Sequence, residues 1–148
     1  MREPETLYVE PTNRCNLRCT TCPRTYFDQE PLKDMSLAEF SFVLEQVPGA
    51  KRVVLHGLGE PLLNPDLADM VAMAKGQGRH VLFNSNALEL DQEISHQLIA
   101  AGLDELRVSV DLPSPQLYPT VRRGGALEVV YDNVARLNAA KVAAGSEV

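Results

Sequence analysis

The chain alternates short apolar stretches with longer segments whose apolar residues recur at helical spacing. Four of the short stretches are rich in Val and Leu and have the length of β-strands. Each is followed by a loop and then by a helical pattern, which predicts four strand–helix units in a row. The predicted strands are Leu7–Glu10, Arg52–His56, His80–Phe83 and Leu106–Val110.

The segments between these strands carry signals for helix ends. Ser36 and Glu39 form a capping-box pattern before the first helix. Asn64 followed by Pro65 predicts that the second helix begins there. The third helix is predicted from Asp91 and stops at Gly102, a typical terminating residue. The apolar stripes of the four helices are Leu37, Phe40, Leu44 and Val47; Leu67, Met70, Val71 and Ala74; Ile94, Leu98 and Ala101; and Leu127, Val130, Val134 and Leu137.

Repeated strand–helix units indicate an α/β fold in which helices cover a parallel sheet. An eight-unit barrel of this kind takes about 250 residues, or about 31 per unit. Four units therefore use up the 148 residues of this chain. The last residues fall where a fifth strand is due. Two architectures remain open at this point: a small open α/β domain, or a barrel that is cut short.

The fourth predicted strand helps to separate these two architectures. Its residues alternate between apolar and polar, whereas a sheet covered on both faces has continuous apolar strands. The polar side must therefore point into a barrel lumen or toward a ligand, which favours a curved sheet, that is, a partial parallel (β/α) barrel. The apolar row is Leu106, Val108 and Val110, and the polar row is Arg107, Ser109 and Asp111.

Composition and charge narrow the class of function. Apolar residues make up 45% of the chain, which is enough for one domain with its own core. A formal net charge of −6 argues against binding to nucleic acid or to a membrane surface, because both are polyanionic. No apolar run approaches the roughly 20 residues that span a bilayer, and the first residues lack the apolar stretch of a signal peptide. We therefore expect a cytoplasmic protein.

The three cysteines of the chain, Cys15, Cys19 and Cys22, lie within eight residues just after the first predicted strand. An odd number of closely spaced cysteines indicates metal binding in a reducing compartment rather than disulfides. Structural zinc normally has four protein ligands, whereas three thiolates hold three corners of a soft metal centre and leave one position open. An iron–sulfur cluster with one open iron fits best. A structural zinc loop and inert core thiols are the alternatives.

Ligands of parallel α/β sheets bind beyond the carboxyl ends of the strands, and further polar motifs fall there. They combine a glycine turn with one carboxylate, amide side chains and a basic glycine loop, a set that suits an amino-acid ligand with its amine and carboxylate. The motifs are Gly59-Glu60-Pro61, Asn84-Ser85-Asn86-Ala87 and Arg122-Arg123-Gly124-Gly125.

Each of these motifs also has a plainer interpretation. Glu60 is interpretable as an exposed turn residue, and Asn84 and Asn86 as turn formers. Ser109 and Asp111 are interpretable as strand-end residues, and Arg122 and Arg123 as a solvated pair. For His56 we favour a buried histidine whose hydrogen bonds are satisfied over a residue that lines the site. For Arg14, Arg18 and Arg24 a solvated loop is favoured over tuning of the metal centre.

Together the motifs resemble those of the radical S-adenosylmethionine enzymes, over essentially the whole chain. Cys15-x3-Cys19-x2-Cys22 is similar to the cluster-binding motif of this family, and Gly59-Glu60-Pro61 to its motif for the methionyl amine. Ser85-Asn86-Ala87 stands where many members have Thr-Asn-Gly, and Val108-Ser109-Val110-Asp111 is similar to a fourth-strand Ser-x-Asp. The residues around the first two motifs resemble the SPASM and twitch members, which modify peptides, proteins and cofactors.

The resemblance implies a set of cofactors and an activity. Cys15, Cys19 and Cys22 would hold a [4Fe–4S] cluster whose open iron binds S-adenosylmethionine. Reductive cleavage would give a 5′-deoxyadenosyl radical that abstracts hydrogen from an unknown substrate, for example a peptide or a cofactor precursor. No catalytic residue beyond the cluster is implied, and an external donor such as flavodoxin or ferredoxin would supply the electron. The implied cofactor-binding residues are Gly59, Glu60, Pro61, Asn86, Ser109, Asp111 and Arg122.

Two departures from the family pattern qualify these expectations. Thr21 stands where members often have an aromatic residue, so the adenine must pack elsewhere. Family barrels have six strand–helix units, so we expect residues 1–148 to be a core domain truncated on its C-terminal side, with exposed sheet edges that favour self-association. Two other functions remain open: a non-enzymatic iron–sulfur or zinc module for electron transfer or partner binding, and a folding unit without turnover.

Overall fold

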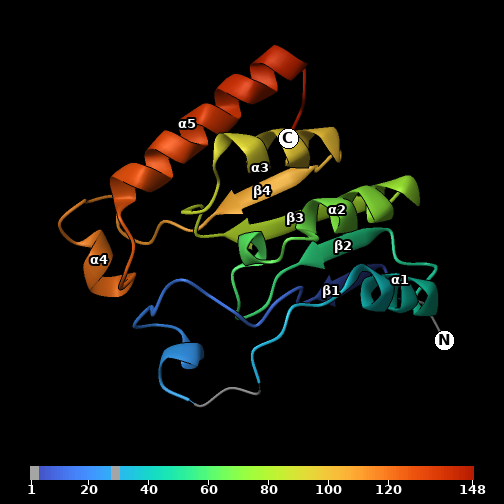
Figure 1. Cartoon of the computed structure of the whole chain (residues 1–148), viewed down its shortest axis with the longest axis horizontal. Helices are drawn as coiled ribbons and strands as arrows, with labels where there is room; N and C mark the ends of the chain where they lie inside the picture. The colour runs from blue at the N-terminus through green and yellow to red at the C-terminus, as the bar shows by residue number, and fades with distance from the viewer. Residues whose placement is uncertain (1–3, 28–30) are drawn as a thin grey trace.

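The structure is a computed structural model that describes residues 4–27 and 31–148. At its centre lies a sheet in the order β1-β2-β3-β4 (Figure 1). Each strand pairs in parallel with the strand that follows it along the chain. This arrangement confirms the predicted α/β fold with four strand–helix units. The strands are β1 (Thr6–Val9), β2 (Arg52–Leu55), β3 (His80–Ser85) and β4 (Glu105–Val108), each within a few residues of its predicted bounds.

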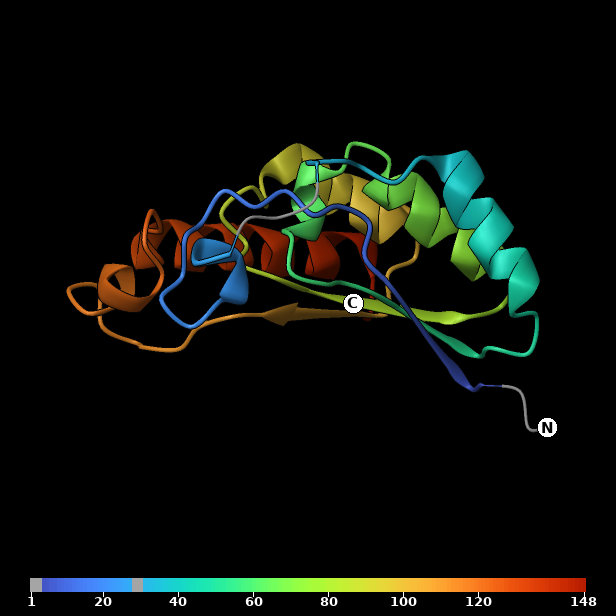
Figure 2. The same cartoon turned by 90° about the horizontal axis from the view of Figure 1, so that it is seen from below.

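The helices α1, α2, α3 and α5 lie on one side of the sheet, and the other face carries no covering helix in the described part of the chain (Figure 2). No helix within residues 4–27 and 31–148 is long and apolar enough to cross a membrane. The bounds are α1 (Leu37–Gln46), α2 (Leu67–Gly76), α3 (Gln92–Ala100), a short α4 (Tyr118–Val121) and α5 (Leu127–Ala144), with 3₁₀ turns η1 (Pro23–Thr25) and η2 (Pro61–Leu63).

Two of the helices begin as their capping residues predict. Ser36 and Glu39 form the capping box of α1: the Ser36 hydroxyl oxygen accepts from the Glu39 N–H at 3.3 Å, and the Glu39 carboxylate accepts from the Ser36 N–H at 2.9 Å. The Asp91 carboxylate caps α3 by accepting from the Ile94 N–H at 2.8 Å. Gly102 adopts a φ of 79° just after α3, in the left-handed region that glycine tolerates.

The predicted start of the second helix was wrong. Helix α2 begins at Leu67 rather than at Pro65. The Asn64 side chain accepts from the Asp66 N–H at 2.8 Å, which forms a turn before the helix. The same side chain donates to the Pro11 carbonyl oxygen at 2.7 Å. Asn64 therefore joins the loop after β2 to the loop after β1 instead of capping a helix.

The two faces of the sheet have opposite character. The helix-covered face is the core, in which Phe40, Phe83 and Tyr118 are among the largest fully buried side chains. The apolar row of β4 and its extension packs against this core, while Arg107 on the other face is exposed. Tyr8, also on the uncovered face, is 67% exposed. This alternation confirms the inference that the polar row of the fourth strand points away from the helices.

Candidate functional site

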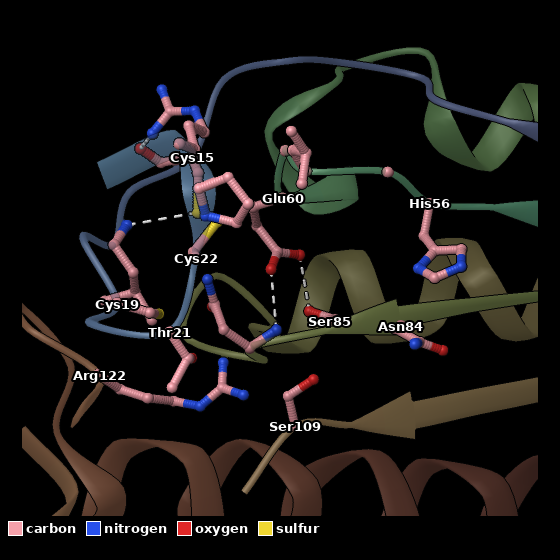
Figure 3. Close-up of a pocket in the computed structure, with 17 residues that line it drawn as sticks. Cys15, Cys19, Thr21, Cys22, His56, Glu60, Asn84, Ser85, Ser109 and Arg122 are labelled. Atoms are coloured by element: carbon pink, nitrogen blue, oxygen red, sulfur yellow. Dashed lines mark hydrogen bonds between the residues drawn. The ribbon is translucent and has the colours of Figure 1, made fainter. Parts of the chain in front are cut away.

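A cavity of about 310 Å³ opens at the carboxyl ends of the strands. Its walls come from the loops after β1 and β2, the ends of β3 and β4, and the segment after α4 (Figure 3). Of the residues proposed as cofactor ligands, the structure brings eight to this cavity and leaves two, Pro61 and Asp111, outside its lining. The eight are Cys15, Cys19, Cys22, Gly59, Glu60, Asn86, Ser109 and Arg122.

The cysteine loop, residues 11–25, presents its three half-buried thiols to the cavity, and none forms a disulfide. Backbone hydrogen bonds hold the loop against the end of α4 and the residues just after it: Arg18 N–H donates to the Arg123 carbonyl at 3.0 Å, and Thr20 N–H donates to the Val121 carbonyl at 2.8 Å. Burial raises the pKa of the Cys19 thiol, and the nearby Arg122 guanidinium opposes that shift.

Two arginines brace the loop rather than being simply solvated, so that expectation was wrong for both. The Arg14 guanidinium donates to Asp34 at 2.9 Å and to the Leu63 carbonyl at 2.5 Å, which ties the cysteine loop to the loop after β2. Arg24 donates to the Asn13 carbonyl at 2.8 Å and lines the cavity. The loop that carries the cysteines is thus held at its base by side chains and at its tip by backbone contacts.

The Glu60 loop, residues 57–64, contacts the cysteine loop so closely that one glycine is required. A Cβ atom on Gly59 would lie 1.9 Å from the carbonyl oxygen of Thr12. The Glu10 carboxylate accepts from the N–H groups of Leu58 and Gly59, at 2.5 and 3.0 Å. Gly59 therefore serves the approach of the two loops, a physical reason for the glycine in the motif.

Glu60 is only 3% exposed, so its interpretation as an exposed turn residue was wrong. Its carboxylate accepts from the Ser85 hydroxyl at 2.7 Å, the Asn86 N–H at 2.8 Å and the Leu62 N–H at 3.2 Å (Figure 3). Burial raises the pKa of Glu60, and these hydrogen bonds act in the opposite direction. A carboxylate has about four acceptor positions, so one remains for a cationic group.

The Asn86 side chain belongs both to a turn and to the site. Its oxygen accepts from the Leu88 N–H at 3.0 Å, as in a turn, and its amide donates to Asn16 of the cysteine loop at 2.7 Å. The next residue, Ala87, has a φ of 58°. A left-handed backbone at this position explains why glycine would suit it, as in the Thr-Asn-Gly of the family pattern.

Arg122 is positioned at the cavity by Asp111. Its Nε donates to the Asp111 carboxylate at 2.7 Å, and its side chain is 16% exposed against 45% for Asp111. The interpretation of Arg122 as a solvated residue was therefore wrong. Asp111 itself lies outside the cavity lining and contacts Arg122, whereas a direct contact with a cofactor was predicted. Ser109 lines the cavity and its N–H donates to the Ser85 carbonyl at 2.9 Å.

The sequence interpretation undervalued two cavity residues, His56 and Asn84. His56 is half-buried rather than buried, lines the cavity, and packs its ring against Tyr8 at a centroid distance of 6.1 Å. Asn84 lies on the same uncovered face of the sheet, and its side-chain oxygen is buried without a hydrogen-bond partner. The alternation of side chains along a strand could have indicated their position. Each of the two residues directly follows a buried apolar residue, so its side chain lies on the opposite face of the sheet.

The donor set fits the cofactors that the resemblance implies. Three thiols and one buried carboxylate line the same cavity, which suits a soft metal centre beside a cationic ligand. Among the described residues no three His, Cys, Asp or Glu side chains converge on a position for one metal ion. A cubane cluster does not require such convergence, because each cysteine binds a different iron.

Comparison with known proteins supplies the family. The sequence pattern of the Radical SAM superfamily matches residues 9–146. The chain belongs to the radical SAM superfamily. A tungsten-containing aldehyde ferredoxin oxidoreductase cofactor-modifying protein from Pyrococcus furiosus is 35% identical over 114 residues, which cover 74% of this chain and 32% of that protein. A probable GTP 3′,8-cyclase from Methanocaldococcus jannaschii is 28% identical over 138 residues, 91% of this chain and 46% of that protein. This chain therefore spans less than half the length of either relative.

A solved structure confirms the fold class. SuiB from Streptococcus suis, bound to S-adenosylmethionine, superposes with a TM-score of 0.78 at 17% identity, over 92% of this chain and 32% of SuiB. SuiB has also been solved with the precursor peptide SuiA. The predicted partial parallel (β/α) barrel is therefore confirmed. Enzymes of the radical SAM superfamily bind a [4Fe–4S] cluster and S-adenosylmethionine.

Proposed function

We propose that Cys15, Cys19 and Cys22 hold a [4Fe–4S] cluster, that S-adenosylmethionine binds beside it in the cavity, and that the protein abstracts a hydrogen atom from its substrate. When bound, these cofactors supply reductive cleavage of the sulfonium carbon–sulfur bond, which yields methionine and a 5′-deoxyadenosyl radical. The observation that carries the proposal is that the three thiols share one cavity with the buried carboxylate of Glu60.

The residues of the chain divide the binding of S-adenosylmethionine between them. Glu60 keeps one acceptor position for the methionyl ammonium group. The Ser85 hydroxyl and the Asn86 backbone N–H hold the Glu60 carboxylate in place. Arg122 uses Nε for Asp111 and retains both terminal nitrogens for the methionyl carboxylate, which a guanidinium binds well in a bidentate manner. We assign Asp111 the role of a positioning residue.

We extend this proposal to the substrate and the electron donor of the whole protein. A cofactor-modifying relative and a neighbour solved with a peptide support a cofactor precursor or a peptide as substrate. We further propose an external electron donor such as flavodoxin or ferredoxin, and action in the cytoplasm. Membership of the SPASM and twitch group stays a prediction.

The decisive experiment reconstitutes the chain with iron and sulfide under anaerobic conditions and measures both cofactor binding and 5′-deoxyadenosine release after addition of dithionite. Glu60→Gln should retain the iron and weaken S-adenosylmethionine binding by about tenfold, because a charge-assisted hydrogen bond is lost. Glu10→Gln is the matched control. It removes the same charge beside the same loop, and Glu10 does not line the cavity.

Two outcomes would contradict the proposal. If iron binds while S-adenosylmethionine neither binds nor changes the cluster spectrum, the non-enzymatic iron–sulfur module becomes the better account. If Glu60→Gln and Glu10→Gln weaken binding equally, Glu60 makes no specific contact with the ammonium group.

A further inference from the structure

A second cavity, of about 190 Å³, lies on the uncovered face of the sheet next to the cofactor cavity. The two cavities share His56 and Asn84 in their walls. His56 directly follows β2 and Asn84 lies on β3, and Figure 3 shows both side chains beside the residues of the cofactor cavity. The second cavity is lined by Thr6, Tyr8, Arg52, Val54, His56, Leu82, Asn84 and Arg107.

Strand register brings the polar members of this lining together. Asn84 on β3 stands opposite Arg107 on β4, and Leu82 stands opposite Glu105. Residues two apart on a strand share a face, so Glu105, Arg107 and Asn84 are neighbours on the uncovered face. Arg52 belongs to the same face of β2 and reaches across to Glu105, with Nη2 at 3.2 Å from the carboxylate.

The charges on this face leave a local positive excess. The single carboxylate of Glu105 pairs with two guanidinium groups, those of Arg52 and Arg107, the latter through Nε at 2.6 Å. Both imidazole nitrogens of His80 lie 3.8 Å from carboxylate oxygens, one of Glu105 and one of Asp104. Two guanidinium groups around one carboxylate form a cationic position in a chain whose formal net charge is −6.

Two residues that line this cavity, Arg52 and Asn84, each carry a buried side-chain polar atom without a hydrogen-bond partner in the described part of the chain. Among the described residues four buried side-chain atoms lack a hydrogen bond, and two of them, Arg52 Nε and Asn84 Oδ1, belong to residues that line this cavity. An unpaired buried polar atom is costly, so buried polar atoms normally meet a hydrogen-bond partner, a ligand or ordered water. Arg52 Nε requires an acceptor, and Asn84 Oδ1 requires a donor.

We propose that this cavity binds the anionic end of the substrate, a carboxylate or a phosphate. Arg107 and Arg52 receive the anionic oxygens, and a neighbouring hydroxyl or N–H of the substrate donates to Asn84 Oδ1. The remainder of the substrate extends past His56 toward the cofactor cavity, where its C–H group meets the radical. The inference rests on the proposed function for the reaction, but anion binding itself requires only residues of this chain.

The test is an NMR titration of the full chain, without cofactors and at constant ionic strength, with inorganic phosphate and separately with succinate. The Arg52 Nε–H and Asn84 side-chain amide signals should shift in a saturable manner. Arg107→Met should weaken binding about fivefold, as expected for one lost charged hydrogen bond. Glu105→Gln should strengthen it about threefold, because both guanidinium groups lose their competing carboxylate.

Lys51→Met is the matched control, because Lys51 is exposed, precedes Arg52 in the chain and does not line the cavity. Tighter binding of phosphate or of succinate identifies which anion the site prefers. The inference is overturned if neither anion binds saturably, if Lys51→Met weakens binding as much as Arg107→Met, or if Glu105→Gln brings no gain. Anion binding without S-adenosylmethionine binding would refute the proposed function alone, and the reverse result would refute this inference alone.

Discussion

The cysteine loop and the Glu60 loop form adjoining walls of one cavity, but the chain supports them in different ways. Glu60 is buried, and its carboxylate is fixed by three donors of the chain itself. The cysteines are half-buried, and the hydrogen bonds of their loop involve backbone atoms and bracing arginines far more than sulfur. The fold thus fixes the Glu60 carboxylate by hydrogen bonds, whereas the thiols line the cavity with few hydrogen bonds of their own. Substitutions of the cysteines should therefore change mainly metal binding, whereas substitutions in the Glu60 loop should also change the stability of the fold.

The largest expected effect is on metal binding. Serine at Cys15, Cys19 or Cys22 should reduce bound iron from about four atoms per chain to near zero, because a cubane cluster needs all three thiolates. The unfolding temperature of the metal-free chain should change by less than about 2 °C, since the thiols carry little of the packing. Iron analysis and circular dichroism measure the two quantities. A metal-free variant that unfolds much earlier would show that the thiols are structural.

The next largest effect concerns the contact between the loops. Gly59→Ala places a methyl group where the Thr12 carbonyl stands, so one loop must move, at a cost of about 3 kcal/mol in the free energy of unfolding. Gly76→Ala is the control: outside its own helical turn, no atom of the described residues lies within 4 Å of its Cβ position, and it should stabilise α2 by about 0.5–1 kcal/mol. Denaturant unfolding measures both, and equal effects would contradict the close contact.

Removal of the Glu60 carboxylate should have a somewhat smaller effect on stability. Glu60→Ala leaves the Ser85 hydroxyl and two backbone N–H groups without their acceptor, while it also removes a buried charge. The net loss expected is about 2 kcal/mol in the free energy of unfolding. Denaturant unfolding of the metal-free chain tests this value. If Glu60→Ala is as stable as the cysteine variants, the contrast between the two loops is refuted.

The smallest effect lies at the outer anchor of the cysteine loop. Asn13 bonds to the backbone of Lys33, and the Lys33 side chain pairs with Glu39 of the α1 capping box. The hydrogen bond from Lys33 and those from Ser36 lower the pKa of Glu39 to about 2. A carboxyl whose folded pKa is lowered stabilises the fold above its ordinary value of 4.5, and that contribution is lost as the pH falls toward 2. The unfolding temperature of Glu39→Gln should therefore vary less between pH 4.5 and pH 2 than that of the wild type. Identical profiles would contradict the assignment.

Features that depend on near neighbours in the chain were predicted correctly. The capping box at Ser36 and the cap at Asp91 involve partners three residues away, and the alternation on β4 follows from strand geometry. Features that depend on distant partners were missed. Asn64 resembles a helix cap, but its amide bonds to Pro11 and Met35 of other segments. Such partners are set by packing, which local patterns do not record.

At the site, too, the contacts with distant residues were the part that the sequence did not predict. Arg122 and Asp111 were both predicted as cofactor ligands; Arg122 lines the cavity, whereas Asp111 lies outside its lining and bonds to Arg122. Pro61 was grouped with the cofactor ligands, whereas it is buried at the start of η2 and helps to set the turn that follows Glu60. His56 was expected to be buried because the uncovered face of the sheet cannot be recognised from one strand alone.

The sequence by itself determined that the three thiols belong to one short loop, because the cysteines fall within eight residues. It also determined the order of strands and helices, which follows from local periodicity. Only the tertiary structure decided that Glu60 is buried with one acceptor position left, and that Arg52, Asn84 and Arg107 meet around a second cavity. Burial and hydrogen-bond partners at these positions arise from parallel pairing of strands far apart in the chain.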